Sequence, residues 1–209
     1  MEESPKIDVA RTHLPSYLAL PESAMVVAAW SLSIQVSPRF LWNHALRTCS
    51  WGFLLAKADQ VEFDRELLCV ASLLHDLGLT ERFRGTRCFE KESAEAAVRL
   101  ARDGGWDSDR CSKLGEVIRL HMQPRVVRED GPEAYLLSEA AACDVTGSRY
   151  EDLPSDLRDR VLSIADREGF KEGFTRLFLE QARLNPGCMA NVYMRQGLAE
   201  RIASAPFAD

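Results

Sequence analysis

The segment ELLCVASLLHD, residues 66–76, limits the fold most strongly, because it is apolar on almost every side and ends in two ionisable residues. A helix that is apolar all round is a buried helix, so His75 and Asp76 are expected inside the protein. Burying an imidazole beside a carboxylate costs several kcal/mol unless each group has a strong partner. A divalent cation is such a partner, and the pair is therefore a candidate metal site.

Two further candidate ligands lie in other apolar segments. His44 shares one face of a predicted helix with Phe40, Thr48 and Trp51, because these residues recur at intervals of three or four. Taken alone, such a histidine is more often a core residue bonded to a backbone carbonyl. Asp144 stands in the Ala-rich stretch AAACDV, where a carboxylate that caps a neighbouring helix or pairs with an arginine is the alternative to a metal ligand.

The remaining pattern is helical throughout. No convincing alternation of apolar and polar residues and no long repeat is visible, so we expect an all-α protein of seven to nine helices. The expected helices lie at about 22–35, 38–58, from Asp64 to Gly78, at 90–102, from Asp107 to Pro124, from Pro132 to Gly147, after Pro154, at 170–184 and at 191–203.

Charge and cysteine usage narrow the class of protein. The net charge of −6 argues against a nucleic-acid groove as the main surface. The apolar run MVVAAW is far shorter than the roughly 20 residues of a membrane span, and the start MEESPKID lacks the basic region of a secretory signal. The six cysteines form no CxxC pair, and we expect all of them to be reduced. These features predict a soluble cytoplasmic protein.

Five ordered stretches carry a family resemblance: WNHALRT, ELLCVASLLHDLGLTERF, RCFEKESAEAA, VIRLHMQP and ACDVTG. Together they resemble HD-domain proteins of the cyanamide hydratase-like branch over about residues 38–185. The resemblance implies one helical domain, residues 22–209, that follows an irregular lead-in of residues 1–21 and holds a metal at its centre. The ligands that it implies are His44, His75, Asp76 and Asp144.

The same resemblance bears on the number and kind of metal ions. Family members with two metals have two further histidines between the HD pair and the last aspartate, whereas this chain offers only His121 there. We therefore expect one divalent ion, which would act as a Lewis acid. Zinc is the ion that the resemblance implies, and mixed nitrogen and oxygen ligands also suit iron, manganese, cobalt or nickel.

Other residues are candidates for proton transfer and substrate contact. His121 and Glu90, with Asp76, are the predicted catalytic residues; His121 could equally be a core-edge histidine bonded to a carbonyl of the previous turn, and Glu90 could simply favour a helix start. Arg47, Trp51 and Glu81 are the predicted substrate contacts, with a structural pairing of Arg47 to Asp144 or Glu90, and core packing of Trp51, as alternatives.

Three functions follow, and the sequence ranks them. The first is a hydratase or hydrolase of a small molecule, similar to cyanamide hydratase. The second is a phosphohydrolase, which would need several positive donors near the metal. The third is a metal-stabilised binding module without turnover. The expected partner is a small molecule, with no nucleic acid or membrane, and the apolar C-terminal helix (Val192, Tyr193, Leu198, Ile202) is also compatible with a homo-oligomer.

Overall fold

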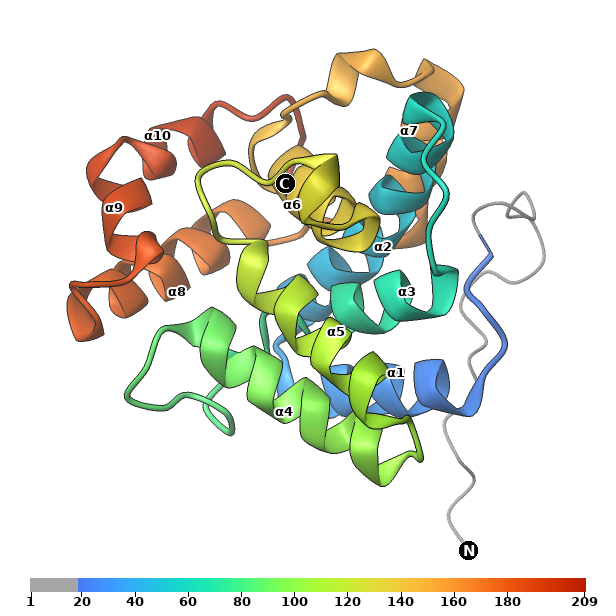
Figure 1. Ribbon diagram of the computed structural model, residues 1–209. Helices are drawn as coiled ribbons and strands as arrows, with labels where there is room; N and C mark the ends of the chain where they lie inside the picture. Colours follow the sequence, from blue (N-terminus) through green and yellow to red (C-terminus); the bar gives the residue numbers. More distant parts are fainter. Residues whose placement is uncertain (1–18) are drawn as a thin grey trace, which may run out of the picture.

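The computed structural model describes residues 19–209 and is all-α over that range, as predicted (Figure 1). The predicted lead-in, with His13, lies almost entirely outside the described residues. In chain order the α-helices are α1 (Ala24–Val36), α2 (Arg39–Asp59), α3 (Arg65–Leu74), α4 (Phe89–Asp103), α5 (Ser108–Leu120), α6 (Pro132–Thr146), α7 (Ser155–Ile164), α8 (Phe170–Leu184), α9 (Met189–Arg195) and α10 (Leu198–Ala203). Three single 3₁₀ turns are η1 (Leu77–Leu79), η2 (Arg128–Asp130) and η3 (Tyr150–Asp152).

Most helix ends lie where the sequence predicts them. The Asp64 carboxylate caps α3 by accepting a hydrogen bond from the backbone N–H of Leu67 at 3.0 Å, and Asp107 caps α5 in the same way. Pro132 opens α6, and Gly147 ends it with a φ of 77°, a left-handed conformation that suits glycine. Local capping chemistry therefore fixes these helix boundaries.

Two predicted boundaries are wrong. Helix α3 does not run to Gly78 but ends at Leu74, and the chain turns through His75 and Asp76 into η1. Gly78 instead allows a close approach, because a Cβ atom there would lie 2.2 Å from the carbonyl oxygen of Phe89. The predicted last helix is two helices, α9 and α10, because Gly197 adopts a φ of 81° between them.

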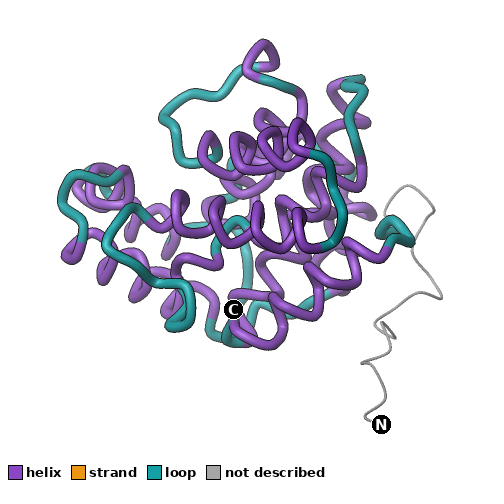
Figure 2. Tube along the Cα trace, turned by 60° about the horizontal axis from the view of Figure 1, so that its bottom comes forward, coloured by secondary structure: helices purple, strands orange, loops and turns teal. Residues whose placement is uncertain are grey.

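Helix α2 is the central element of the fold. Its residues 43–56 are all buried, and it packs against α3, α6, α7 and α8 (Figures 1 and 2). Most of the buried apolar side chains form one cluster around α1–α7. A second cluster is built on Phe170, Phe174 and Phe178 of α8, with contributions from α9 and α10. His44 contacts the rings of Phe170 and Phe174, so the second cluster covers one side of the candidate site.

One cysteine prediction is wrong. Cys88 and Cys188 form a disulfide across a sequence separation of 100 residues. They precede α4 and α9, so the bridge joins the C-terminal helices to the start of α4. The sequence spacing gives no sign of this pair, because the fold alone brings the two residues together. The other four cysteines are buried free thiols, as expected.

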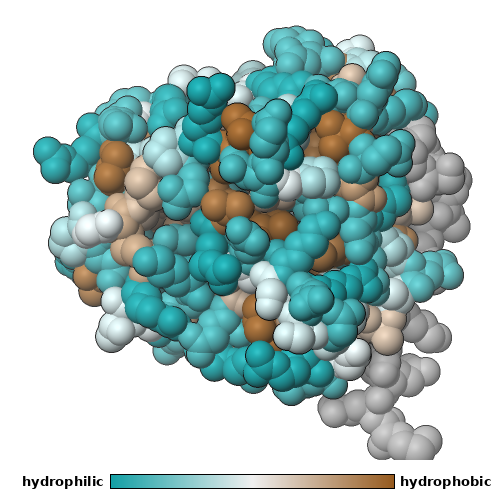
Figure 3. Space-filling view, in the orientation of Figure 1, coloured by the Kyte–Doolittle hydropathy of each residue, from teal (hydrophilic) through white to brown (hydrophobic). Residues whose placement is uncertain are grey.

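The surface gives no test of the predicted partners. None of the described helices is long and apolar enough to cross a membrane. The face shown in Figure 3 is mostly hydrophilic, with small separate apolar patches. The exposed large apolar residues are Val27, Ile34, Leu179, Leu184 and Val192. A homo-oligomer and a cytoplasmic location therefore stay predictions.

Candidate metal centre

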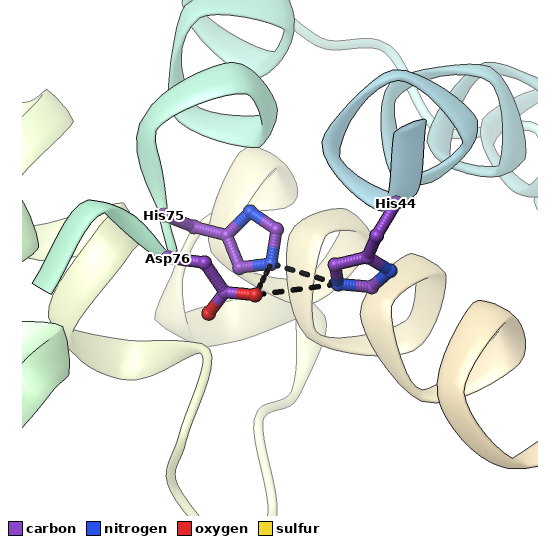
Figure 4. A group of neighbouring side chains, drawn as sticks. All are labelled: His44, His75 and Asp76. Atoms are coloured by element: carbon purple, nitrogen blue, oxygen red, sulfur yellow. Dashed lines mark hydrogen bonds and ion pairs between the residues drawn. The ribbon is translucent and has the colours of Figure 1, made fainter. Parts of the chain in front are cut away.

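Three predicted ligands meet at the centre of the bundle (Figure 4). His44 comes from the first half of α2, and His75 and Asp76 lie in the turn that follows α3. The two Nε2 atoms are 3.2 Å apart, and Asp76 Oδ2 lies 3.5 Å from that of His44 and 3.3 Å from that of His75. All three side chains are almost completely buried. Their donor atoms lie within 4.8 Å of one another, so the group can hold a metal ion.

The outer nitrogens of the two imidazoles fix where the inner lone pairs point. His44 Nδ1 lies 2.7 Å from Asp144 Oδ2, and His75 Nδ1 lies 2.7 Å from the carbonyl oxygen of Ser72. Both partners only accept, so each Nδ1 carries the proton and each neutral ring turns its Nε2 lone pair inward. Two lone pairs and a carboxylate oxygen then face one another, and Asp76 Oδ2 has no hydrogen-bond donor among the described residues. A cation between these three atoms would bind all of them, and two imidazole nitrogens with one carboxylate oxygen suit a divalent metal ion.

The pKa values of His44 and Asp76 agree with a cation site. Burial lowers the pKa of His44, which favours the neutral ring that binds a metal. Burial alone would raise the pKa of Asp76, but the neighbouring imidazoles, His75 first, outweigh it and lower that pKa to about 2. The pKa of His75 moves the other way: burial opposes the charged ring, but Asp76 outweighs it, so the pKa rises and favours the protonated ring when no cation is bound. The Asp76 carboxylate is thus ionised at neutral pH.

Asp144 stands behind His44, outside this group. Besides the bond to His44, its oxygens accept from Arg47 Nε at 2.8 Å and Nη2 at 2.9 Å, and from Trp51 Nε1 at 2.8 Å. Arg167 adds an ion pair at 3.2 Å. Burial would raise the pKa of Asp144, but Arg47 and Arg167 outweigh it and hold the pKa well below its ordinary value.

These contacts use the hydrogen-bonding capacity of the Asp144 carboxylate. Two carboxylate oxygens offer about four lone-pair sites, and three neighbours besides His44 already occupy them. The structure therefore gives Asp144 the position of a residue that orients His44 and fixes its tautomer. A carboxylate that holds the outer nitrogen of a metal-binding histidine is a common supporting arrangement. The prediction that Asp144 itself binds the metal has no support from its position.

A cavity of about 340 Å³ reaches the three ligands. Its buried end is formed by the ligands, His121 and side chains of α8 and α6. Its outer end, here called the mouth, is formed by the exposed residues Gln123, Pro124, Arg125 and Arg201. The volume lies at the lower end of the range for small-molecule sites.

Residues 41–168 match the HD domain family, and this segment is more than half of the chain. The chain belongs to the HD domain family. A comparison with curated proteins found no match, so the cyanamide hydratase-like branch stays a prediction. HD domains are generally metal-dependent hydrolases, which agrees with the His44, His75 and Asp76 group.

The three predicted substrate contacts, Arg47, Trp51 and Glu81, do not line the cavity. Arg47 and Trp51 have no exposed surface, and both bind Asp144, which is the structural alternative that the sequence left open for Arg47. Glu81 is exposed and does not line the cavity. None of these three positions supports a contact with substrate.

Of the predicted proton-transfer residues, His121 lines the cavity and Glu90 does not. His121 lines the cavity, and its ring lies with its centroid 5.0 Å from that of His75. Its Nδ1 donates to the carbonyl of Ile118, as the structural alternative expected, and this bond leaves Nε2 free to accept a proton. Glu90 is buried but does not line the cavity, and its Oε2 has no partner among the described residues.

Arg125, Arg201 and Arg167 lie at or behind the site but were not predicted from the sequence. Arg125 follows His121 by four residues, so its place after α5 is the signal that could have been used. Arg201 and Arg167 come from segments without a recognisable motif, and only the packing of the C-terminal helices reveals them.

Proposed function

We propose that this HD domain is a metal-dependent hydrolase that acts on a small molecule bound in the central cavity. One observation carries the proposal: the His44 and His75 lone pairs and the Asp76 carboxylate converge at the closed end of a cavity that opens to solvent. A buried structural site has no use for such access. A divalent ion held by these residues would supply Lewis-acid chemistry.

His121 is the residue that we propose moves a proton. Burial, with a further contribution from His75, lowers the pKa of His121 to about 4, so the ring is neutral at pH 7. A neutral ring with its Nδ1 proton held by Ile118 presents Nε2 as a proton acceptor to the cavity. Asp144 and Arg47 do not reach the cavity: Asp144 holds His44 in place, and Arg47 holds Asp144.

The cavity favours hydrolysis of a moderately sized molecule over hydration of a few-atom nitrile. A molecule as small as cyanamide would leave most of about 340 Å³ unfilled. An open cavity of that size instead suits a ligand that spans from the metal to the mouth. Hydration of a small nitrile, which the sequence ranks first, is therefore the second candidate function.

A panel assay tests this proposal. Purified protein is loaded with zinc, manganese, iron, cobalt or nickel and offered phosphate monoesters, nucleotides, simple esters and amides, and cyanamide. The proposal expects hydrolysis of at least one class, lost after chelation and restored by metal. His121→Gln should lower kcat by about 10²–10⁴-fold without loss of bound metal. Turnover of cyanamide alone would favour the hydratase.

The non-catalytic alternative makes a separate prediction. If the metal only stabilises the fold, His75→Ala should unfold the protein. If the protein is an enzyme, the same variant should stay folded and lose metal and activity together. Circular dichroism and metal analysis of this one variant distinguish the two readings.

A further inference from the structure

Two arginines line the outer end of the cavity. Arg125 belongs to the loop after α5, and Arg201 belongs to α10. The loop is held to the C-terminal helices, because the Tyr193 hydroxyl of α9, the helix before α10, donates to the carbonyl oxygen of Met122 at 3.2 Å. The yellow-green loop and the red helices lie side by side in Figure 1. The mouth therefore carries two arginines, from two segments that are far apart in the sequence.

Neither arginine has an acidic partner among residues 19–209. By contrast, two arginines of the loop before α4 are paired: Arg84 with Glu180, and Arg87 with Glu92. Arg125 and Arg201 are exposed, line the cavity and form no ion pair within the described part of the chain. Besides Asp76, the acidic residue of the cavity lining is Glu139, which lies 3.6 Å from the guanidinium of Arg149. The two mouth cations are thus free to bind an anion.

Arg125 and Arg201 are the arginines that line the cavity. Arg47 and Arg167 lie behind His44, against the carboxylate of Asp144, and do not line it. Between His44 and the mouth, the cavity is lined by apolar side chains that include Phe174 and Phe178. A ligand that fits has an apolar middle and a negative end.

We infer that Arg125 and Arg201 bind the anionic group, a carboxylate or a phosphate, of a substrate whose hydrolysable bond lies at the inner end of the cavity. This inference rests on the proposed function and names its substrate class. Guanidinium groups bind both anions through paired, charge-assisted hydrogen bonds. The arginines would act as specificity-determining residues, because they select substrates by the end that does not react.

Calorimetric binding to the metal-loaded full-length protein tests the inference. The probes are phenyl phosphate and benzoate, with neutral benzamide as the matched uncharged compound. The variants are Arg125→Gln, Arg201→Gln and the double variant. Arg195→Gln is the control, because Arg195 is also exposed and unpaired among the described residues, lies on α9 and does not line the cavity.

The inference expects at least one anion to bind more tightly than benzamide. Each single variant should weaken that anion about tenfold, the double variant should approach the affinity for benzamide, and the control should match the wild type. Added salt should weaken the anion and leave benzamide unchanged, because exposed charges are screened. A preference for phenyl phosphate assigns the phosphate, and a preference for benzoate assigns the carboxylate.

Two results would overturn the inference. Anion affinity that persists in the double variant would place the anion elsewhere, and equal binding of benzamide would remove the role of charge. Metal content, measured on the same samples, separates this from the proposed function. Metal-dependent hydrolysis without arginine-dependent anion binding rejects the inference alone. Arginine-dependent binding in a protein that takes up no metal supports the anion site and rejects the proposed function.

Discussion

Asp144 either positions His44 or binds the metal itself, and replacing Asp144 by asparagine in the metal-free protein distinguishes these two roles. Asparagine keeps the shape of the side chain and removes the charge. Arg47 and Arg167, both buried, would then lose the carboxylate that they share. Breaking a buried ion pair by removing one partner costs about 3–5 kcal/mol. For a chain of this length, that loss lowers Tm by about 6–20 °C.

A metal ligand without this supporting role would behave in the opposite way. Without the ion, a carboxylate that only binds metal is an uncompensated buried charge, so its neutralisation should leave the metal-free protein as stable or make it more stable. Urea denaturation of chelator-treated wild type and Asp144→Asn therefore decides between the readings. Trp51→Phe is the milder companion, because it removes one hydrogen bond to Asp144 and should cost about 1.5–3 kcal/mol. Unchanged or raised stability of metal-free Asp144→Asn would refute the reasoning.

The other expected outcomes concern stability away from the ligands. Reduction of the Cys88–Cys188 bridge should lower the free energy of unfolding by about 2–5 kcal/mol, seen as a lower urea midpoint with a reductant than without one. Gly78→Ala should cost about 1–3 kcal/mol by urea denaturation, because its Cβ meets a carbonyl oxygen; a neutral effect would contradict the close approach. Hydrogen bonds from Arg149 hold the pKa of Asp59 below its ordinary value, so the pair should stabilise the fold above the unfolded pKa of about 3.9. The stability difference between wild type and Asp59→Asn should then shrink as pH falls through the folded pKa, and a constant difference would argue against the pair.

The ligand group was predictable because buried charge leaves a clear mark in a sequence. His75 and Asp76 directly follow an apolar segment, and His44 lies on an apolar face, so each buried polar side chain needs a partner. The helix pattern was equally readable, since Asp64 and Gly147 mark ends by local chemistry.

The features that the sequence does not predict depend on contacts between segments that are far apart in the chain. The role of Asp144 is set by which of its neighbours lie close enough to occupy its oxygens, and Arg167 comes from another segment. Cys88 and Cys188, which precede α4 and α9, likewise meet only in the folded chain. The mouth arginines belong to a loop and to α10, and neither segment carries a pattern that points to a cavity.

The central claim is that His44, His75 and Asp76 together hold one divalent ion. Anomalous diffraction from crystals of the purified protein, recorded at the absorption edge of the metal found by elemental analysis, tests it most directly. The account predicts one peak about 2.0–2.2 Å from both Nε2 atoms and from an Asp76 oxygen, with Asp144 still bound to His44 Nδ1. A metal-loaded crystal with no peak among these three side chains would contradict it.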